Sequence, residues 1–336
     1  MKVKMLGLYI RAMVALSLIF IGTGVSWAAK RYLVTIESPL TYQVFKQASQ
    51  KKNGKSPALQ MLAHSGARVE KMLDQVQMVV VNADSNKAVE DLKGQYGIAD
   101  VEEEFFIPVP QSLPSIRSFA LAAEKVSIPW GIEAVRAPEA WLGSHAGRDV
   151  RVLVLDTGID KDHPDLASRF EKGKNFADVD LTDAPYDYFD NISHGTHVAG
   201  TIAADGKVSG LVGVAPEARI LSARVCSSMG CSSISILDGI NWGIQEKVDV
   251  MNLSLGGPIP SRAGEKAYKQ AAAAGIVVVC ASGNDGVNQV SYPGAYDSTI
   301  AVGAVDEDIV KADFSNWGSE LDIMAPGVNV LSSVPQ

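Results

Sequence analysis

Long apolar runs alternate with helical patterns from residue 126 to residue 336. The runs at 150–158, 218–226, 248–257, 276–283 and 299–305 contain few polar residues and are rich in Val, Ile and Leu. Strands that are apolar at nearly every position are typical of sheets whose two faces are both covered by helices. The pattern therefore predicts an α/β domain with a doubly wound, mostly parallel sheet. In such a sheet the active site lies outside the carboxyl ends of the strands.

A smaller unit of mixed character precedes this domain, over residues 29–107. Extended segments and one segment of helical spacing occur in it, at 31–37, 75–83, 99–109 and, for the helix, 86–96. Ser85 or Asn86 can cap the helix. A β-α-β-β-α-β order of the ferredoxin-like α+β type fits this pattern.

Residues 1–28 have the composition of a secretory signal peptide. Three basic residues lie in the first eleven positions, an apolar run follows at 12–25, and Ser26 and Ala28 fit a small-residue cleavage site. The alternative is a membrane anchor, but the run is shorter than the ~20 residues that a span needs. Residues 108–125 mix Pro, Ser and Ala without periodicity, which predicts an exposed linker that contains a processing site.

Charge narrows the choice of partners. The formal net charge of the chain is −8 at pH 7, and residues 126–336 hold 15 basic against 27 acidic residues. An acidic surface argues against nucleic acid and anionic membranes as partners. We expect a protein that is monomeric and exported.

Three cysteines are too few for a disulfide scaffold. Cys226 and Cys231 flank a four-residue segment and could close a small loop outside the cytoplasm, but spacing alone does not decide whether they pair. Cys280 lies within an apolar run and is expected to be a small buried side chain.

The stretch "DNISHGTHVAG" holds two of the five histidines of the chain, His194 and His197. Three roles are open for them: a metal pair, core residues, or a catalytic base. The His-Glu-x-x-His helix of zinc proteases carries a Glu as general base, whereas Gly195 and Thr196 stand between these histidines. Ser193 is a possible N-cap, and the positive end of a helix would favour a neutral imidazole that can accept a proton.

Asp156 follows the apolar run 151–155 directly and precedes a Thr-Gly turn. At the carboxyl edge of the sheet it could carry a functional role, or it could simply cap a helix or form the turn.

Several motifs resemble those of the subtilisin-like serine proteases. "VLDTGIDKDHPDL", "DNISHGTHVAGTIAA", "VGVAPEARI", "MNLSLGG", "ASGNDG" and "FSNWGSELDIMAPGV" occur in the order and near the spacing of that family. The resemblance covers residue 126 to about residue 333. Residues 29–107 resemble, more weakly, the family propeptide, which serves as an intramolecular chaperone and inhibitor.

The resemblance assigns roles to individual positions. Asp156 and His194 match the catalytic Asp and His, and Asn284 matches the side-chain donor of the oxyanion hole. His197 matches a structural position, so we assign it to packing. Two further groups are expected to bind substrate: Ser254, Leu255 and Gly256 as a strand that pairs with it, and Ala281, Ser282 and Gly283 as a pocket wall. Met229 to Ser232 lie near a second pairing edge. The pocket wall of small residues indicates a broad preference that leans toward apolar side chains.

The expected nucleophile is missing from the sequence. A Gly-Thr-Ser-Met-Ala segment should follow "APGVNVLSSVP", and residues 1–336 contain none. Ser332 and Ser333 are expected in the preceding strand and lack the glycine turn, and Ser315 matches a non-catalytic position. We expect a fragment of a longer gene product that is inactive as it stands. The alternative is a naturally truncated pseudo-protease that acts as a binding or inhibitor protein. An in-frame Gly-Thr-Ser codon run after Gln336 would distinguish the two.

No cofactor is required for the expected chemistry, and structural calcium is doubtful. Asp165 matches a ligand of the calcium site of the family, but Lys207 and Val126 replace oxygen-bearing ligands, and a cation opposes Ca²⁺ binding. The acidic run 176–191 could bind calcium elsewhere or form a solvated loop. The resemblance thus implies an exported endopeptidase precursor that acts on polypeptides and carries its own inhibitor, with a catalytic domain over 126–336.

Overall fold

A computed structural model describes residues 30–50, 65–95, 97–109, 128–177 and 188–336. The expected signal peptide, nearly all of the expected linker and most of the acidic run 176–191 lie outside these residues.

In its described residues, the N-terminal unit is an antiparallel sheet with two helices on one face. Its elements in chain order are β1 (Lys30–Ile36), α2 (Pro39–Gln50), β2 (Ala67–Leu73), β3 (Met78–Ala83), α4 (Asn86–Lys93) and β4 (Ile98–Glu103). The sheet order β2-β3-β1-β4 confirms the predicted small α+β unit. Ser85 caps α4, because its Oγ accepts a hydrogen bond of 3.2 Å from the amide of Ala88.

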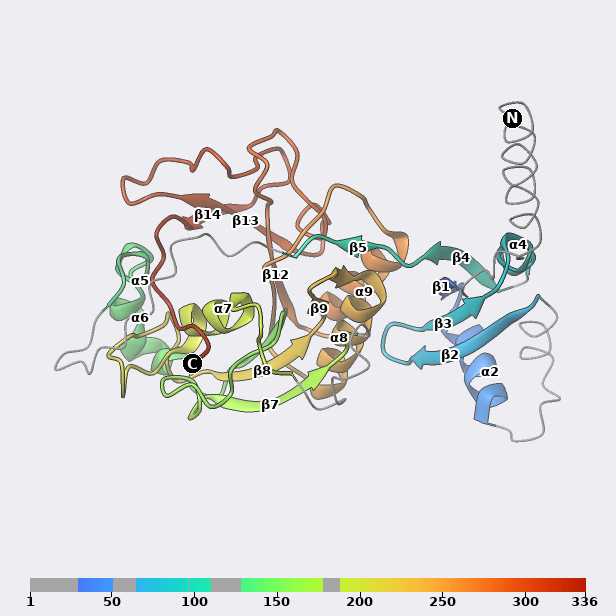
Figure 1. Cartoon of the computed structure of the whole chain (residues 1–336), viewed down its shortest axis with the longest axis horizontal. Coiled ribbons are helices and arrows are strands. Elements are labelled where there is room, and N and C mark those ends of the chain that lie inside the picture. Colours follow the sequence, from blue (N-terminus) through green and yellow to red (C-terminus); the bar gives the residue numbers. More distant parts are fainter. Residues whose placement is uncertain (1–29, 51–64, 96, 110–127, 178–187) are drawn as a thin grey trace, which may run out of the picture.

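The larger unit is built on a parallel sheet of order β14-β13-β12-β11-β6-β8-β7 in the described part of the chain. Its strands are β6 (Arg151–Asp156), β7 (Phe170–Asn175), β8 (Arg219–Arg224), β11 (Val250–Leu253), β12 (Val277–Ala281), β13 (Ile300–Val305) and β14 (Ile323–Pro326). Its helices are α5 (Trp130–Ala134), α6 (Ala137–Ser144), α7 (His194–Ala203), α8 (Ser233–Glu246) and α9 (Arg262–Ala273). The predicted doubly wound α/β fold is confirmed (Figure 1).

Helices cover both faces of this sheet, which explains its continuously apolar strands. In β6, Leu153 and Leu155 join the cluster beneath α8 and α9, whereas Val152 and Val154 join a second cluster with α7. Side chains alternate between the two faces of a strand, so a strand covered on both sides must be apolar at every position. No helix within the described residues has the length and apolar character that a membrane span requires.

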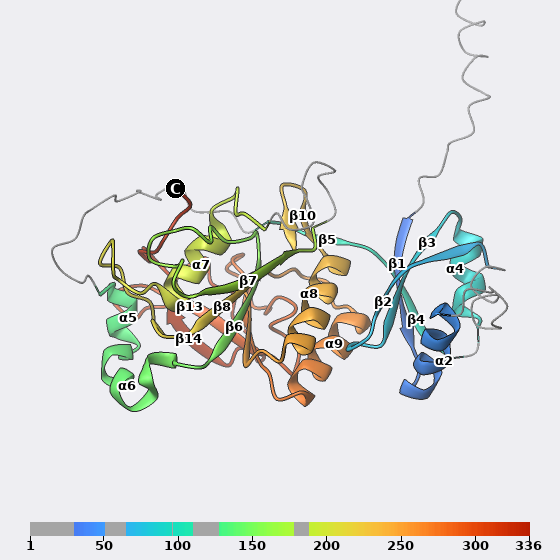
Figure 2. The ribbon, with the colours of Figure 1, turned by 90° about the horizontal axis from the view of Figure 1, so that it is seen from below.

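The two units share one apolar core. Alternate residues of the small sheet face its own helices, such as Val79 and Val81, or face α8 and α9, such as Met78 and Val80. Figure 2 shows this sheet standing beside α8 and α9. After β4 the chain leaves the small unit as β5 (Phe106–Ile107) and forms a separate three-stranded sheet, of order β5-β10-β9, with β9 (Cys226–Ser227) and β10 (Gly230–Ser232) of the larger unit.

Candidate active site

Asp156 and His194 meet at the carboxyl edge of the parallel sheet. Asp156 is the last residue of β6 and only 1% exposed, and His194 is the first residue of α7. The Nδ1–H of His194 donates to the Asp156 carboxylate, at 2.8 Å from Oδ1 and 2.9 Å from Oδ2. The amide of Thr157 donates to the same Oδ1 at 2.6 Å, which fixes the orientation of the carboxylate. This arrangement leaves Nε2 of His194 as the atom that can accept a proton.

A second buried carboxylate, Asp190, caps the helix that carries His194. Its Oδ1 accepts from the amide of Ser193 at 2.8 Å, and its Oδ2 accepts from the amide of Thr196 at 2.8 Å. The predicted cap, Ser193, is wrong in this respect: its side chain makes no capping bond, and its φ is 76°. The Oγ1 of Thr157 donates to Asp190 at 2.8 Å and ties the cap to the end of β6. The quoted motif contained Asp190, but its position four residues before the histidine was the only signal of this role.

The electrostatic surroundings of His194 differ from those expected. Burial lowers its pKa, but the neighbouring Asp156 and, to a lesser degree, Asp190 outweigh this effect and raise the pKa above its ordinary value of 6.5. We expected the helix N-terminus to favour the neutral ring. The raised pKa is the opposite of that expectation, because the two carboxylates stabilise imidazolium.

His197 lies one turn further along α7 and faces the C-terminal segment. Its Nε2 donates to the carbonyl of Val330 at 3.2 Å. Burial, together with the charge that His194 can carry, lowers the pKa of His197 below its ordinary value, although the bond to Val330 opposes this. The position of His197 fits the packing role. The ring that is bonded to Asp156 in the described structure is that of His194.

The candidate oxyanion residue, Asn284, lies in an exposed position on the loop after β12. A buried residue that the sequence analysis did not single out, Asn316, shapes this loop. The side-chain Oδ1 of Asn316 accepts from the backbone amide of Asp285 at 2.8 Å. The backbone amide of Asn316 donates to the carbonyl of Gly283 at 3.0 Å. Gly283 has φ 107°, and a Cβ there would lie 2.3 Å from Asn316 Nδ2, so the loop requires glycine. Asn316 lies within the quoted motif that begins "FSNWG", but nothing in that motif indicated that this residue shapes the loop after β12.

The predicted substrate-pairing segment, Ser254 to Gly256, leads directly to Gly257, which faces β5. Ser254 Oγ accepts from Asn252 at 2.9 Å, and Leu255 is buried. Gly256 packs against Ser291, and a Cβ on Gly257 would lie 3.7 Å from the side chain of Ile107. Of the predicted pocket wall, Ala281 ends β12 and Ser282 is buried, with its amide donating to the carbonyl of Val302 at 2.9 Å.

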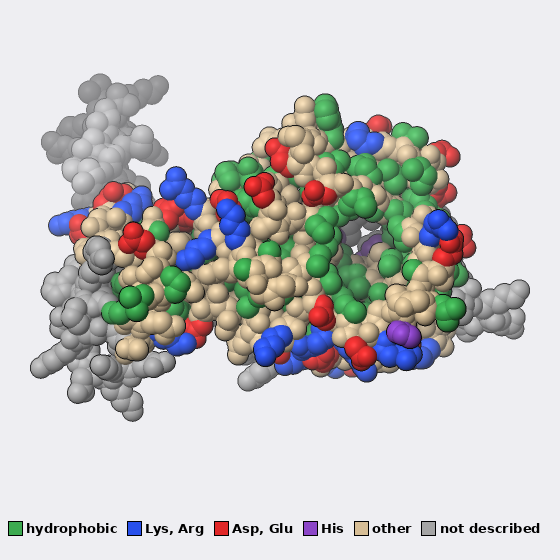
Figure 3. Space-filling view, turned by 180° about the vertical axis from the view of Figure 1, so that it is seen from behind, with side chains coloured by type: hydrophobic (Ala, Val, Ile, Leu, Met, Phe, Trp, Pro, Cys, Tyr) green, Lys and Arg blue, Asp and Glu red, His purple; other side chains and the backbone are tan. Residues whose placement is uncertain are grey.

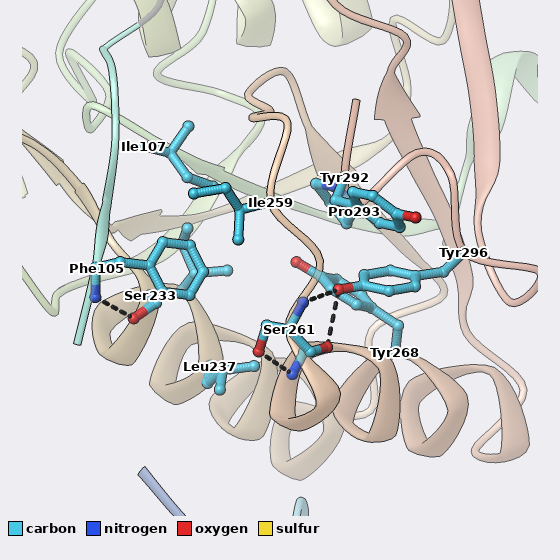
Figure 4. A pocket seen from close by; sticks show the side chains of 12 residues that line it. Phe105, Ile107, Ser233, Leu237, Ile259, Ser261, Tyr268, Tyr292, Pro293 and Tyr296 are labelled. Carbon is cyan, nitrogen blue, oxygen red and sulfur yellow. Dashed lines mark hydrogen bonds between the residues drawn. The ribbon is translucent and has the colours of Figure 1, made fainter. Parts of the chain in front are cut away.

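On its other side, β5 pairs antiparallel with β10. Ile107 lies opposite Cys231, and Phe106 lies opposite Ser232. An apolar pocket opens beside this strand, lined by Phe105 and Ile107 together with residues of α8, α9 and the loops near Tyr292 (Figure 4). At its base the hydroxyl of Tyr296 accepts from the amide of Ser261 at 2.7 Å and donates to its carbonyl at 2.9 Å.

Asp165 lies at the centre of a tightly bonded loop. Its buried carboxylate accepts from the amides of Val208 at 3.1 Å and Ser209 at 3.0 Å, and also from the Ser209 hydroxyl. Beside it, Lys207 Nζ binds the carboxylate of Asp205 at 2.7 Å, a side chain that is 1% exposed. The ammonium therefore supplies the positive charge in this loop, and the donor set around it does not suit a divalent cation.

The serines near the C-terminal end of the chain lie in irregular structure after β14. We expected Ser332 and Ser333 within a strand, and this expectation is wrong. Ser332 Oγ donates to the carbonyl of His197 at 2.6 Å, and Ser333 is buried against α7, where a Cβ on Gly200 would contact both serines.

On the face shown in Figure 3, the larger unit has a hollow edged by hydrophobic side chains, with a histidine in its depth.

Known proteins resemble this chain over nearly its whole length. Residues 147–336 match the family model described as "Subtilase family". Subtilisin E of Bacillus subtilis (strain 168) is 37% identical over 98% of this chain and 82% of its own length. An intracellular serine protease of Paenibacillus polymyxa is 45% identical over 62% of this chain and 65% of its own length. A subtilisin of Bacillus pumilus is 45% identical over 62% of this chain and 76% of its own length.

Proposed function

Because the chain belongs to the subtilase family, we propose that the complete protein is an exported serine endopeptidase, synthesised as a precursor with its own inhibitor. The observation that carries the proposal is the pair formed by buried Asp156 and His194, with Nδ1 2.8 Å from the carboxylate, at the carboxyl edge of a parallel sheet. Active sites of such sheets lie at this edge.

In the proposed reaction His194 acts as a general base. Asp156 holds the ring so that Nε2 takes the proton of a serine hydroxyl, whose oxygen attacks the peptide carbonyl. The carboxylates of Asp156 and Asp190 stabilise the imidazolium that forms, and the same proton then passes to the leaving amine. Asn284, together with a backbone N–H, is proposed to donate to the oxyanion. The acyl-enzyme that results is hydrolysed by water.

We propose that none of the described serines is the nucleophile of this reaction. Ser332 is bonded to the carbonyl of His197, Ser333 is buried, and Ser315 donates to the carbonyl of Asn316 at 3.2 Å. We propose that a serine outside residues 1–336 completes the site, so that these residues alone do not hydrolyse peptide esters.

Substrates are proposed to be extended polypeptides that bind as β5 binds. β5 lies between β10 and the segment around Gly257, and Ile107 points an apolar side chain toward the pocket near Tyr292 (Figure 4). A peptide that adds a strand gains main-chain hydrogen bonds regardless of its sequence, which favours broad specificity with an apolar preference at this pocket.

The N-terminal unit is proposed to inhibit the enzyme because it places its own chain in this groove. Glu102 accepts from the amide of Ala263 at 2.6 Å, Lys71 pairs with Asp238 at 2.8 Å, and Lys266 donates to the carbonyl of Ile36 at 2.9 Å. These contacts hold the unit on α8 and α9 while β5 pairs with the edge of β10.

Export is proposed from the composition of residues 1–28, and the protein is proposed to act as a monomer.

We test the proposal with the complete protein, expressed from its full coding sequence. Hydrolysis of a peptide ester should be blocked by a serine-directed inhibitor and should fall by several orders of magnitude in His194→Ala, because the general base is lost. His145→Asn serves as the matched control, since His145 is exposed and its φ of 52° tolerates asparagine. If His194→Ala retained substantial activity with an unchanged circular dichroism spectrum, the assigned role would be wrong.

A further inference from the structure

The strand β10, which receives the docked segment, is only three residues long. It begins after Met229, which is 65% exposed, and ends at Ser232, whose Oγ caps α8 by accepting from the amides of Ile234 at 3.2 Å and Ser235 at 3.3 Å. The C-terminal end of the strand is therefore anchored by a helix. Its N-terminal end follows an exposed turn and needs another anchor.

A disulfide supplies that anchor. Cys226 and Cys231 face each other across β9 and β10 and are bonded, and both are fully buried. The sequence left this pairing open, and the structure settles it. β9 has only two residues, and so short a pair of strands is marginal without further support.

The same residue that forms the disulfide faces the docked strand. Cys231 lies opposite Ile107 on one side of β10 and opposite Cys226 on the other. Gly230 has φ 127°, and a Cβ there would lie 2.8 Å from the carbonyl oxygen of Ile107, so only glycine lets the backbone of β5 approach β10 this closely.

The docked strand continues past β10 to the start of α8. The amide of Ser233 donates to the carbonyl of Phe105 at 2.9 Å, and the amide of Phe105 donates to Ser233 Oγ at 3.1 Å (Figure 4). The main-chain contacts of residues 105–107 thus fall on one continuous edge, from Gly230 to Ser233, of which only the second half is held by the helix.

We propose that the Cys226–Cys231 disulfide is a positioning element for this edge: it fixes β10 in the conformation that accepts an added strand, and it thereby sets the affinity for extended peptides. The proposal rests on the proposed function. A crosslink of this kind strengthens binding because it removes the ordering cost that a loose edge would pay at each binding event. In the described structure the side chains of Asp156 and His194 bond to each other and not to the disulfide, so we expect the disulfide to act on binding along β10 and to leave the chemical step unchanged.

The experiment compares the complete wild-type protein with the double variant Cys226→Ser/Cys231→Ser. Two substrates are used: a single-residue ester, which does not reach β10, and a peptide that carries the sequence of residues 104–107 before its scissile bond. A synthetic peptide of residues 101–109 serves as the inhibitor. We expect the KM of the long substrate and the Ki of the peptide to rise about tenfold, with kcat and the kinetics of the ester unchanged.

Cys280→Ala, which removes the buried free thiol, is the matched control and should leave both constants unchanged. If the double variant fails to fold, wild-type protein reduced with dithiothreitol and then reoxidised replaces it, and the rise in KM should reverse. Unchanged constants for the long substrate and the peptide would overturn the proposal, as would equal losses on both substrates. If wild-type protein hydrolyses neither substrate, the proposed function fails, and fluorescence anisotropy of the labelled 101–109 peptide still tests the edge.

Discussion

At the scale of single residues, two carboxylates control the base. Asp156 and Asp190 raise the pKa of His194 above 6.5 despite its burial. Since the base must be neutral to accept a proton, activity should fall as the pH drops through this raised pKa. Asp190→Asn keeps one acceptor oxygen for the helix cap but removes a charge, so it should move the acidic limb of kcat/KM to lower pH.

The measurement is a pH profile of kcat/KM for the complete protein with a peptide ester. Asp162→Asn is the matched control, because Asp162 is exposed and pairs only with Lys161 in the described structure, and it should leave the limb in place. A limb that does not move in Asp190→Asn would show that this carboxylate acts only as a cap. Asp156→Asn should instead lower kcat by about 10⁴-fold, because an amide no longer holds the reactive tautomer.

Sequence motifs identified the candidate catalytic residues Asp156 and His194. They did not identify the residues that fix the surrounding backbone, Asp190 and Asn316. Asp156 and His194 were predicted because the motifs around them resemble those of the subtilisin-like proteases, whereas their positions at the end of a strand and the start of a helix left other roles open. Asp190 and Asn316 act through backbone amides of neighbouring turns, a role that any Asp or Asn in a loop can play. Only the folded structure shows which amides they meet, so their function could not be predicted from residue type and spacing.

At the scale of an element, the loop from Asp205 to Ser209 is held by its own lysine. Lys207 binds the buried carboxylate of Asp205 at 2.7 Å, while Asp165 is saturated by donors from the loop. We therefore expect the chelator EDTA to leave the melting temperature of the protein unchanged. Lys207→Met should lower the melting temperature by a few degrees, because it removes the nearer cation from the buried carboxylate of Asp205 and leaves the Arg169 guanidinium, at 3.9 Å, a loss of about 1 kcal/mol.

The pH dependence of this pair follows from the lowered pKa of Asp205, whose ion pair and hydrogen bonds, above all with Lys207, outweigh the effect of burial. A lowered folded-state pKa gives a stabilisation that is present above the ordinary carboxyl range and is lost as the pH falls through the folded value. The difference in melting temperature between wild type and Lys207→Met should thus be constant near neutrality and shrink only below about pH 4. Lys161→Met, at an exposed pair, is the control. A fall in melting temperature with EDTA would show that a metal ion stabilises the protein.

The elements that the sequence pattern failed to predict are those with an exposed face. The strand β7, with the sequence FEKGKN, lies at the edge of the parallel sheet and is mostly polar. The strand β2, with the sequence ARVEKML, mixes apolar and charged residues. Edge strands need only one apolar face, and charged side chains protect them from pairing with other chains. Central strands such as β12 were predicted readily because both of their faces are buried.

At the scale of the whole molecule, the small unit and the larger unit complete each other. Leu33, Leu73 and Met78 of the small sheet belong to the same buried cluster as Ile234 and Leu237 of α8. The apolar run around Met78 predicted a strand, but it did not show that its second face is covered by the other unit. Without the larger unit, the four-stranded sheet would expose this apolar face to water, which lowers its stability. We therefore expect the small unit to gain order on docking.

One of the charged contacts between the two units lies at a helix end, where its contribution can be tested. Glu102 accepts from the amide of Ala263 at 2.6 Å at the N-terminus of α9, where a negative charge is stabilised by the helix dipole. The neighbouring Glu103 instead pairs with Lys30 of its own unit at 2.6 Å and is half exposed. With a polypeptide of residues 29–109 added in trans to the mature, complete enzyme, Glu102→Gln should raise the inhibition constant about fivefold, equivalent to about 1 kcal/mol. Glu103→Gln should leave it unchanged. Equal effects of the two substitutions would mean that overall charge, and not the contact with the end of α9, holds the inhibitor in place.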